Sequence, residues 1–145
     1  MDIMDKQLAL YNQKLRERVL ILLYQREFRT ETFNELDILL NNNENSLSKD
    51  SIELAIKIND NILEIDNIIK EFLENWTFER ISSTDKATLR IGIYELMHMK
   101  ELEPKIVIDR IVRLSKKFGE EESGKFVNGI LGAVYRKYVD INAKL

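Results

Sequence analysis

The segment FVNGILGAVYRKY, residues 126–138, carries the strongest amphipathic pattern in the chain. Its apolar residues recur at i, i+1, i+4 and i+5, which is the period of a helix and not of a strand. The composition around this segment points the same way, because the chain has only five glycines and one proline, and none of them precedes Gly92. Since a β-rich domain needs turn residues at short intervals, the sequence predicts an all-α fold.

The length and composition are those of one globular domain. Residues 1–145 are enough for a single domain with a core of its own, and 44% of them are apolar and 32% charged. The chain has no cysteine and one histidine, which excludes disulfides, a cysteine nucleophile and a multi-histidine metal site. The longest apolar run, residues 19–24, is too short to span a bilayer, and the N-terminus does not resemble a signal peptide. We therefore expect a cytoplasmic protein with no membrane contact.

Apolar periodicity and capping residues predict about seven helices. The first covers residues 12–28 and has two adjacent apolar stripes, the second of which includes Tyr24 and Phe28. The asparagine-rich segment 41–45 predicts a loop. The remaining boundaries are expected at N-caps Thr30, Ser48, Asp66, Ser82 and Ser123, at Pro104 as a helix start, and at Gly119 as a helix end.

Charge is distributed unevenly along the chain. The net charge is +2 over residues 1–29, −8 over residues 30–75 and +3 over residues 76–145. If the two basic ends meet in the fold, they form a positive face opposite an acidic one. The alternative is that the middle helices merely have acidic, solvated sides.

The last helix has a stripe of unusual composition, formed by Lys125, Gly129, Gly132 and Arg136. Each glycine costs about 1 kcal/mol relative to alanine inside a helix. Close helix–helix packing is the favoured explanation, and close approach of a ligand backbone held by the two flanking cations is the other. No residues pair a nucleophile with a base, and no glycine-rich phosphate loop occurs. The sequence therefore predicts neither an enzyme nor a cofactor or metal site.

Four segments together resemble the NusB transcription antitermination family. They are LRERVLILLYQ (15–25), LRIGIYEL (89–96), EPKIVIDRIVRLSKKFG (103–119) and KFVNGIL (125–131). The resemblance implies an all-helical, non-catalytic protein built of two packed helical bundles. It further implies binding of single-stranded boxA RNA in nascent ribosomal RNA together with the ribosomal protein NusE, within the RNA polymerase antitermination complex.

The resemblance also assigns candidate binding residues. Those for RNA are Lys14, Arg16, Arg18, Arg90 and Lys125, and those for NusE are Tyr24, Phe28 and Glu95. The basic segment NQKLRER (12–18) has fewer arginines than the family often has, which implies weaker and less salt-dependent binding.

The chain also departs from the family by removing negative charge near its C-terminus. Arg110 and Arg113 stand where glutamates are common, and Gly132 stands where an aspartate is usual. These changes are expected to compensate for the reduced N-terminal run, unless the two arginines only pair with the acidic middle helices. The alternative function is a protein-interaction module, for example a homodimer that buries the same basic face, without a role in RNA binding.

Overall fold

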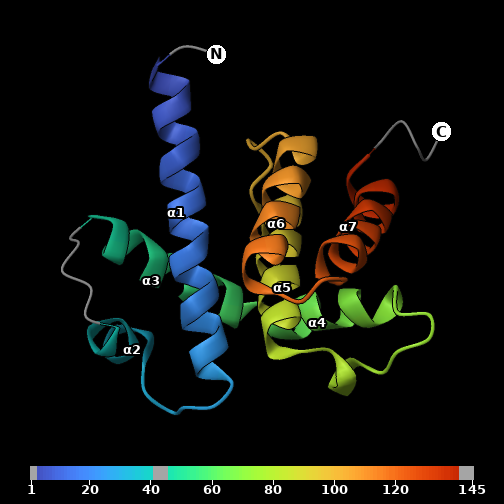
Figure 1. The fold of residues 1–145 in the computed structure, drawn as a ribbon, viewed down its shortest axis with the longest axis horizontal. Helices are drawn as coiled ribbons and strands as arrows, with labels where there is room; N and C mark the ends of the chain where they lie inside the picture. Colours follow the sequence, from blue (N-terminus) through green and yellow to red (C-terminus); the bar gives the residue numbers. More distant parts are fainter. Residues whose placement is uncertain (1–2, 41–45, 141–145) are drawn as a thin grey trace. The chain divides into compact units, whose positions relative to one another are not determined.

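The computed structural model describes residues 3–40 and 46–140, with side chains described for 12–40 and 47–140, and contains only helices and loops there (Figure 1). The predicted all-α fold of about seven helices is thereby confirmed. A short 3₁₀ turn, η1, precedes α5, and a π-helical segment, η2, follows α7. The bounds are α1 Ile3–Arg26, α2 Phe33–Leu39, α3 Ser46–Asp60, α4 Ile62–Glu71, η1 Phe78–Arg80, α5 Ser83–His98, α6 Pro104–Phe118, α7 Ser123–Val134 and η2 Tyr135–Val139.

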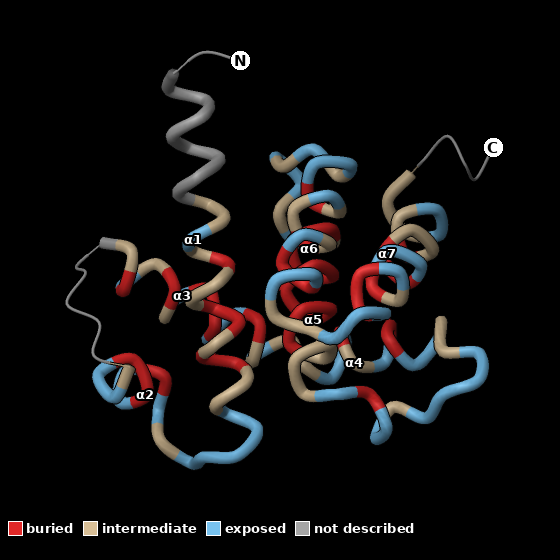
Figure 2. Tube along the Cα trace, in the orientation of Figure 1, coloured by how far each residue is buried: buried red, intermediate tan, exposed pale blue. Residues whose placement is uncertain are grey.

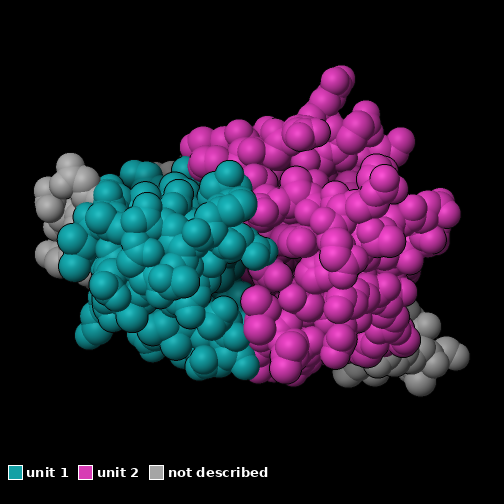
Figure 3. All heavy atoms as spheres, turned by 90° about the horizontal axis from the view of Figure 1, so that it is seen from below, with its two compact units in different colours: residues 1–60 teal, residues 61–145 magenta. Residues whose placement is uncertain are grey.

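The chain divides into two compact units, residues 1–60 and 61–145 (Figure 3). In the first unit α1, α2 and α3 all contact one another. In the second unit α5 contacts α4, α6 and α7, and α6 also contacts α7. Each unit is thus a helical bundle around its own buried side chains (Figure 2). The single domain over residues 1–145 stays a prediction.

The apolar stripes of the first helix form much of the core of the first unit. Val19, Leu20, Leu22 and Leu23 are each at most 3% exposed. The predicted extension to Phe28 is wrong: α1 ends at Arg26, and Phe28 is 66% exposed. The chain leaves the helix through a tight turn, in which the amide of Phe28 donates to the carbonyl oxygen of Gln25 at 3.0 Å.

Two predicted N-caps of the first unit are displaced. Thr32, and not Thr30, caps α2, because its hydroxyl accepts from the amide of Glu35 while the Glu35 side chain accepts from the amide of Thr32. Such a reciprocal capping box satisfies two free amides and outweighs a single cap. Ser48 lies inside α3, which begins at Ser46, and its hydroxyl donates to the Asp37 carboxylate. The predicted loop 41–45 lies outside the described residues.

The break in the long middle segment was predicted near Ile65 with Asp66 as N-cap, and this is wrong. The helices α3 and α4 meet at Asn61, directly after the polar residues Asn59 and Asp60. Asparagine and aspartate favour turns over helix interiors because their side chains compete for backbone hydrogen bonds. Ile65 is instead fully buried within α4.

The helix boundaries in the second unit agree more closely with those predicted from the sequence. Ser82 caps α5 by accepting from the amide of Asp85 at 3.1 Å, Pro104 is the first residue of α6, and Gly119 directly follows its last. Ser123 does not cap α7 but is its first residue. Its hydroxyl accepts from the amide of Glu120 at 2.9 Å, and therefore organises the preceding loop.

The glycines have different surroundings from those expected. A Cβ atom at Gly129 would meet nothing within 4 Å, and one at Gly132 would meet only the guanidinium of Arg136, at 3.3 Å. Close helix packing is therefore wrong as the explanation for this stripe. It applies instead to Gly92 in α5, where a Cβ atom would lie 2.9 Å from the Leu131 side chain and 3.3 Å from that of Ile111.

We expect Gly92→Ala and Gly129→Ala to change stability in opposite directions. Gly92→Ala should lower the free energy of unfolding by about 1 kcal/mol, because overpacking among α5, α6 and α7 exceeds the gain in helix propensity. Gly129→Ala should raise it by about 0.5–1 kcal/mol, because only the propensity changes. Urea unfolding of both variants measures this difference, and equal stabilisation by both would contradict the packing described for Gly92.

Candidate nucleic-acid interface

A groove of about 490 Å³ in the second unit contains Lys125, one of the predicted RNA-binding residues. The groove lies between the segment that follows α4 and one face of α7 and η2. Its lining combines two cations, Lys125 and Arg136, with the aromatic rings of Trp76 and Phe126. Gly129 lies between the two cations in the sequence and leaves the α7 wall open.

Two acidic residues, Glu71 and Glu74, also line the groove. The Glu71 carboxylate accepts hydrogen bonds from the Lys137 ammonium and the Tyr138 hydroxyl. The bond from Lys137 holds the pKa of Glu71 below its usual value, and the bond to Glu71 raises the pKa of both Lys137 and Tyr138. Lys125 and Arg136 form no ion pair with any residue in the described ranges, and both line the groove.

A second cationic cluster surrounds the ring of Phe78. The ammonium groups of Lys86 and Lys70 lie 4.6 and 5.1 Å from the ring centroid, and the guanidinium carbon of Arg90 lies 5.8 Å from it. Such contacts attract a cation to the face of an aromatic ring. These residues come from α4, η1 and α5, and no single motif or helical period could have linked them in the sequence.

Arg90 itself is held within this cluster. Its side chain donates from Nε and Nη2 to the two carboxylate oxygens of Asp66, at 2.9 and 3.0 Å, and the residue is only 7% exposed. Lys70 is exposed and Lys86 half-buried, so the positive charge that reaches the solvent here comes mainly from the two lysines.

The predicted RNA-binding residues of α1 differ in accessibility. Lys14 is exposed. Arg16 is 5% exposed and donates to the side-chain oxygen of Gln13 at 3.2 Å. Arg18 forms an ion pair of 3.3 Å with Asp37, and its Nε atom is buried with no hydrogen-bond partner among the described residues. Lys14 is therefore the residue of this set whose charge is most accessible.

The predicted partner-binding residues fall into two kinds. Tyr24 and Phe28 form an edge-to-face pair with their ring centroids 5.2 Å apart, and this pair exposes an aromatic surface where α1 ends. Glu95, in α5, is only 2% exposed. In this state its carboxylate is not presented to solvent, and its role in partner binding stays a prediction.

The structure brings the candidates together only in part. Lys14, Arg16 and Arg18 share α1, whereas Arg90 and Lys125 belong to two clusters that have no residue in common. A shared face for the basic residues of both units stays a prediction. Sequence reasoning missed Trp76 and Phe126 as groove residues, because the exposure of Trp76 and its place beside α7 depend on the fold.

The interpretation that Arg113 pairs with the acidic middle helices is wrong. Its guanidinium forms an ion pair of 3.1 Å with Asp109, one turn earlier in α6, and both side chains are more than half exposed. Exposed pairs of this kind contribute only about 0.3–0.5 kcal/mol.

The single histidine, His98, lies in the last turn of α5, and its Nε2 atom is 3.1 Å from a carboxylate oxygen of Glu64. Within the described ranges no cluster of acidic and histidine side chains suited to a metal occurs, and no helix is long and apolar enough to cross a membrane.

Comparisons with a family model, with related sequences and with solved structures all identify the same family. The sequence pattern of the NusB family matches residues 13–136. The transcription antitermination protein NusB of Fervidobacterium nodosum is 38% identical over 86% of this chain and 89% of its own. That of Aquifex aeolicus is 37% identical over 89% of this chain and 90% of its own.

Solved structures agree with these relatives. NusB of T. maritima superposes with a TM-score of 0.78 and 31% identity, over 91% of this chain and 95% of its own. A crystal structure of the antitermination factors NusB and NusE in complex with double-stranded RNA contains a chain with a TM-score of 0.76 and 32% identity. That match covers 88% of this chain and 98% of the other.

Proposed function

The chain belongs to the NusB family of transcription antitermination proteins, and we propose that it binds the boxA segment of nascent ribosomal RNA together with NusE. In this proposal it joins the RNA polymerase antitermination complex as an adaptor and catalyses no reaction. A related chain has been crystallised with NusE and RNA, which supports both partners.

The observation that carries the proposal is the groove beside α7. Recognition of single-stranded RNA requires cations for the phosphates and flat side chains on which bases stack. Lys125 and Arg136, which have no ion pair among the described residues, supply positive charge, and Trp76 and Phe126 supply aromatic surface in the same groove. Gly129 lets a nucleotide backbone approach the helix closely, because no Cβ stands in its way. The open surroundings of Gly129 therefore favour close approach of a ligand backbone as the reason for glycine in the stripe of Lys125, Gly129, Gly132 and Arg136.

For NusE, the aromatic pair at the end of α1 is the best-supported contact. Phe28 is largely exposed and is braced by Tyr24, and exposed aromatic anchors are typical of protein interfaces. The RNA and NusE would thus use different residues, which allows both to bind at once.

The proposal predicts that Gly132→Asp weakens boxA binding. A side chain at this position starts 3.3 Å from the Arg136 guanidinium, so an introduced carboxylate would pair with that cation and compete with phosphate. We expect a loss of about tenfold in affinity, the worth of one charge-assisted contact. Fluorescence anisotropy with labelled boxA RNA at constant salt measures it.

Gly132→Asn is the matched control, since it adds a side chain of the same shape without the charge. It should bind boxA RNA nearly as well as the unchanged protein. Equal losses for the two substitutions would show that shape and not charge matters at this position.

A mobility shift with boxA RNA, with and without NusE, tests the function itself. We expect a stable complex in the presence of NusE and weaker binding in its absence. If the protein bound NusE but no RNA under either condition, the interaction-module alternative would replace the RNA function.

A further inference from the structure

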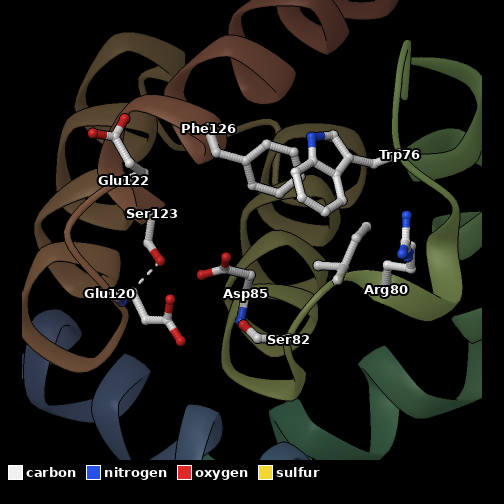
Figure 4. A pocket seen from close by; sticks show the side chains of 9 residues that line it. Trp76, Arg80, Ser82, Asp85, Glu120, Glu122, Ser123 and Phe126 are labelled. Carbon is white, nitrogen blue, oxygen red and sulfur yellow. Dashed lines mark hydrogen bonds between the residues drawn. The ribbon is translucent and has the colours of Figure 1, made fainter.

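A second pocket of the same unit shares Trp76 and Phe126 with the groove (Figure 4). We propose that it binds one unstacked nucleobase that carries an exocyclic amino group, as cytosine does, and this inference rests on the proposed RNA function. The pocket has a volume of about 330 Å³ and is formed by residues before and at the start of α5, by the loop between α6 and α7, and by the first turn of α7.

Aromatic and apolar side chains form part of the pocket wall. Trp76 is 59% exposed, so its ring is accessible to a ligand, whereas Ile81 is 8% exposed. Trp76 and Phe126 both line the pocket, and Figure 4 shows their rings on the side away from Glu120. Bases stack on such surfaces regardless of their sequence, so this part of the pocket provides affinity and not selectivity.

The polar part of the pocket consists mainly of hydrogen-bond acceptors. Asp85, Glu120 and Glu122 line it with carboxylates. The Oδ1 atom of Asp85 is buried and has no hydrogen-bond partner among the described residues. A buried acceptor without a donor is costly, and Figure 4 shows this carboxylate turned toward Ser123 and Glu120. An amino group of a base donates to the carboxylates that line the pocket, whereas the 4-oxo group of uracil presents another acceptor to them.

Continuity with the groove favours RNA over a cationic protein segment as the occupant. An RNA strand could leave its phosphates beside Lys125 and Arg136 and insert a base next to the shared aromatic rings. Arg80, also in the lining, offsets part of the negative charge. A lysine side chain would satisfy the carboxylates, but it would not use the adjacent cationic groove.

Short oligocytidylate and oligouridylate provide the test, because their bases differ at the 4-amino and 4-oxo positions. Binding is followed by anisotropy of the labelled RNA and by quenching of Trp76, the chain's only tryptophan. We expect oligocytidylate to bind about tenfold more tightly, the discrimination of one well-placed base contact. The preference should largely disappear in Glu120→Gln and in Asp85→Asn, because an amide offers both a donor and an acceptor.

Glu121→Gln is the matched control, since it removes the same charge from the same loop outside the pocket lining. It should leave the ratio of the two affinities unchanged. RNA binding with equal affinity for both oligomers would overturn the base pocket and leave the RNA function intact, whereas no binding of either RNA would overturn both. Quenching of Trp76 by a short polylysine peptide but not by oligocytidylate would assign the pocket to a cationic protein segment and overturn the proposal.

Discussion

Replacing Lys125 and Arg136 together by glutamate is expected to weaken boxA RNA binding by about 100-fold, since each charge-assisted phosphate contact is worth about tenfold in affinity. Both side chains are exposed, so the fold should be unaffected and the circular dichroism spectrum unchanged. Anisotropy titrations at fixed ionic strength measure the loss. The effect should exceed that of any single substitution in α1, because Lys14 alone presents accessible charge among the basic candidates there.

The matched control is Lys100→Glu combined with Lys105→Glu. Both lysines are exposed and belong to the same unit, and neither lines the groove. The double replacement changes the net charge by the same amount, so it reports the general electrostatic effect alone. A comparable loss of affinity in this control would show that total charge, and not the groove, determines binding.

The second large effect is expected from Asp66→Ala, which removes the carboxylate that pairs with Arg90 through two hydrogen bonds. The two side chains are only 17% and 9% exposed, and breaking a largely buried pair leaves a desolvated charge behind. We expect the free energy of unfolding to fall by about 2–4 kcal/mol. Urea unfolding gives this value directly.

Asp109→Ala is the control for this pair, because it breaks the ion pair with Arg113 on the exposed face of α6. Its expected cost is below about 0.5 kcal/mol. If Asp66→Ala cost no more than Asp109→Ala, the ion pair between Asp66 and Arg90 would not stabilise the fold as proposed.

The sequence predicted the helices best where local chemistry decides their ends. Ser82 and Pro104 act through their own neighbours in the chain, and both mark helix starts as expected. The predicted break was placed too late because the apolar period continues across Asn61, and this period was given more weight than the turn preference of Asn59 and Asp60. Thr32, and not the predicted Thr30, caps α2, because a reciprocal capping box with Glu35 is more stabilising than a single cap.

The candidate site was predictable only in part, because it is assembled from segments that are distant in the sequence. Lys125 was identified with its stripe, but nothing local indicated that Trp76 would share its groove. The burial of Arg90 depends on Asp66, which lies on another helix. A basic residue is usually expected to be accessible to a ligand, but a buried ion pair makes it inaccessible. No periodic pattern in the sequence predicts such a pair.

The salt dependence of boxA affinity tests most directly the central claim that Lys125 and Arg136, in the groove beside α7, hold the phosphates of the RNA. For single-stranded RNA each phosphate contact contributes about 0.7 to the slope of log affinity against log salt concentration. Lys125→Ala and Arg136→Ala should each lower the slope by about that amount, and the double variant by about twice as much. Slopes unchanged in all three variants would contradict the claim.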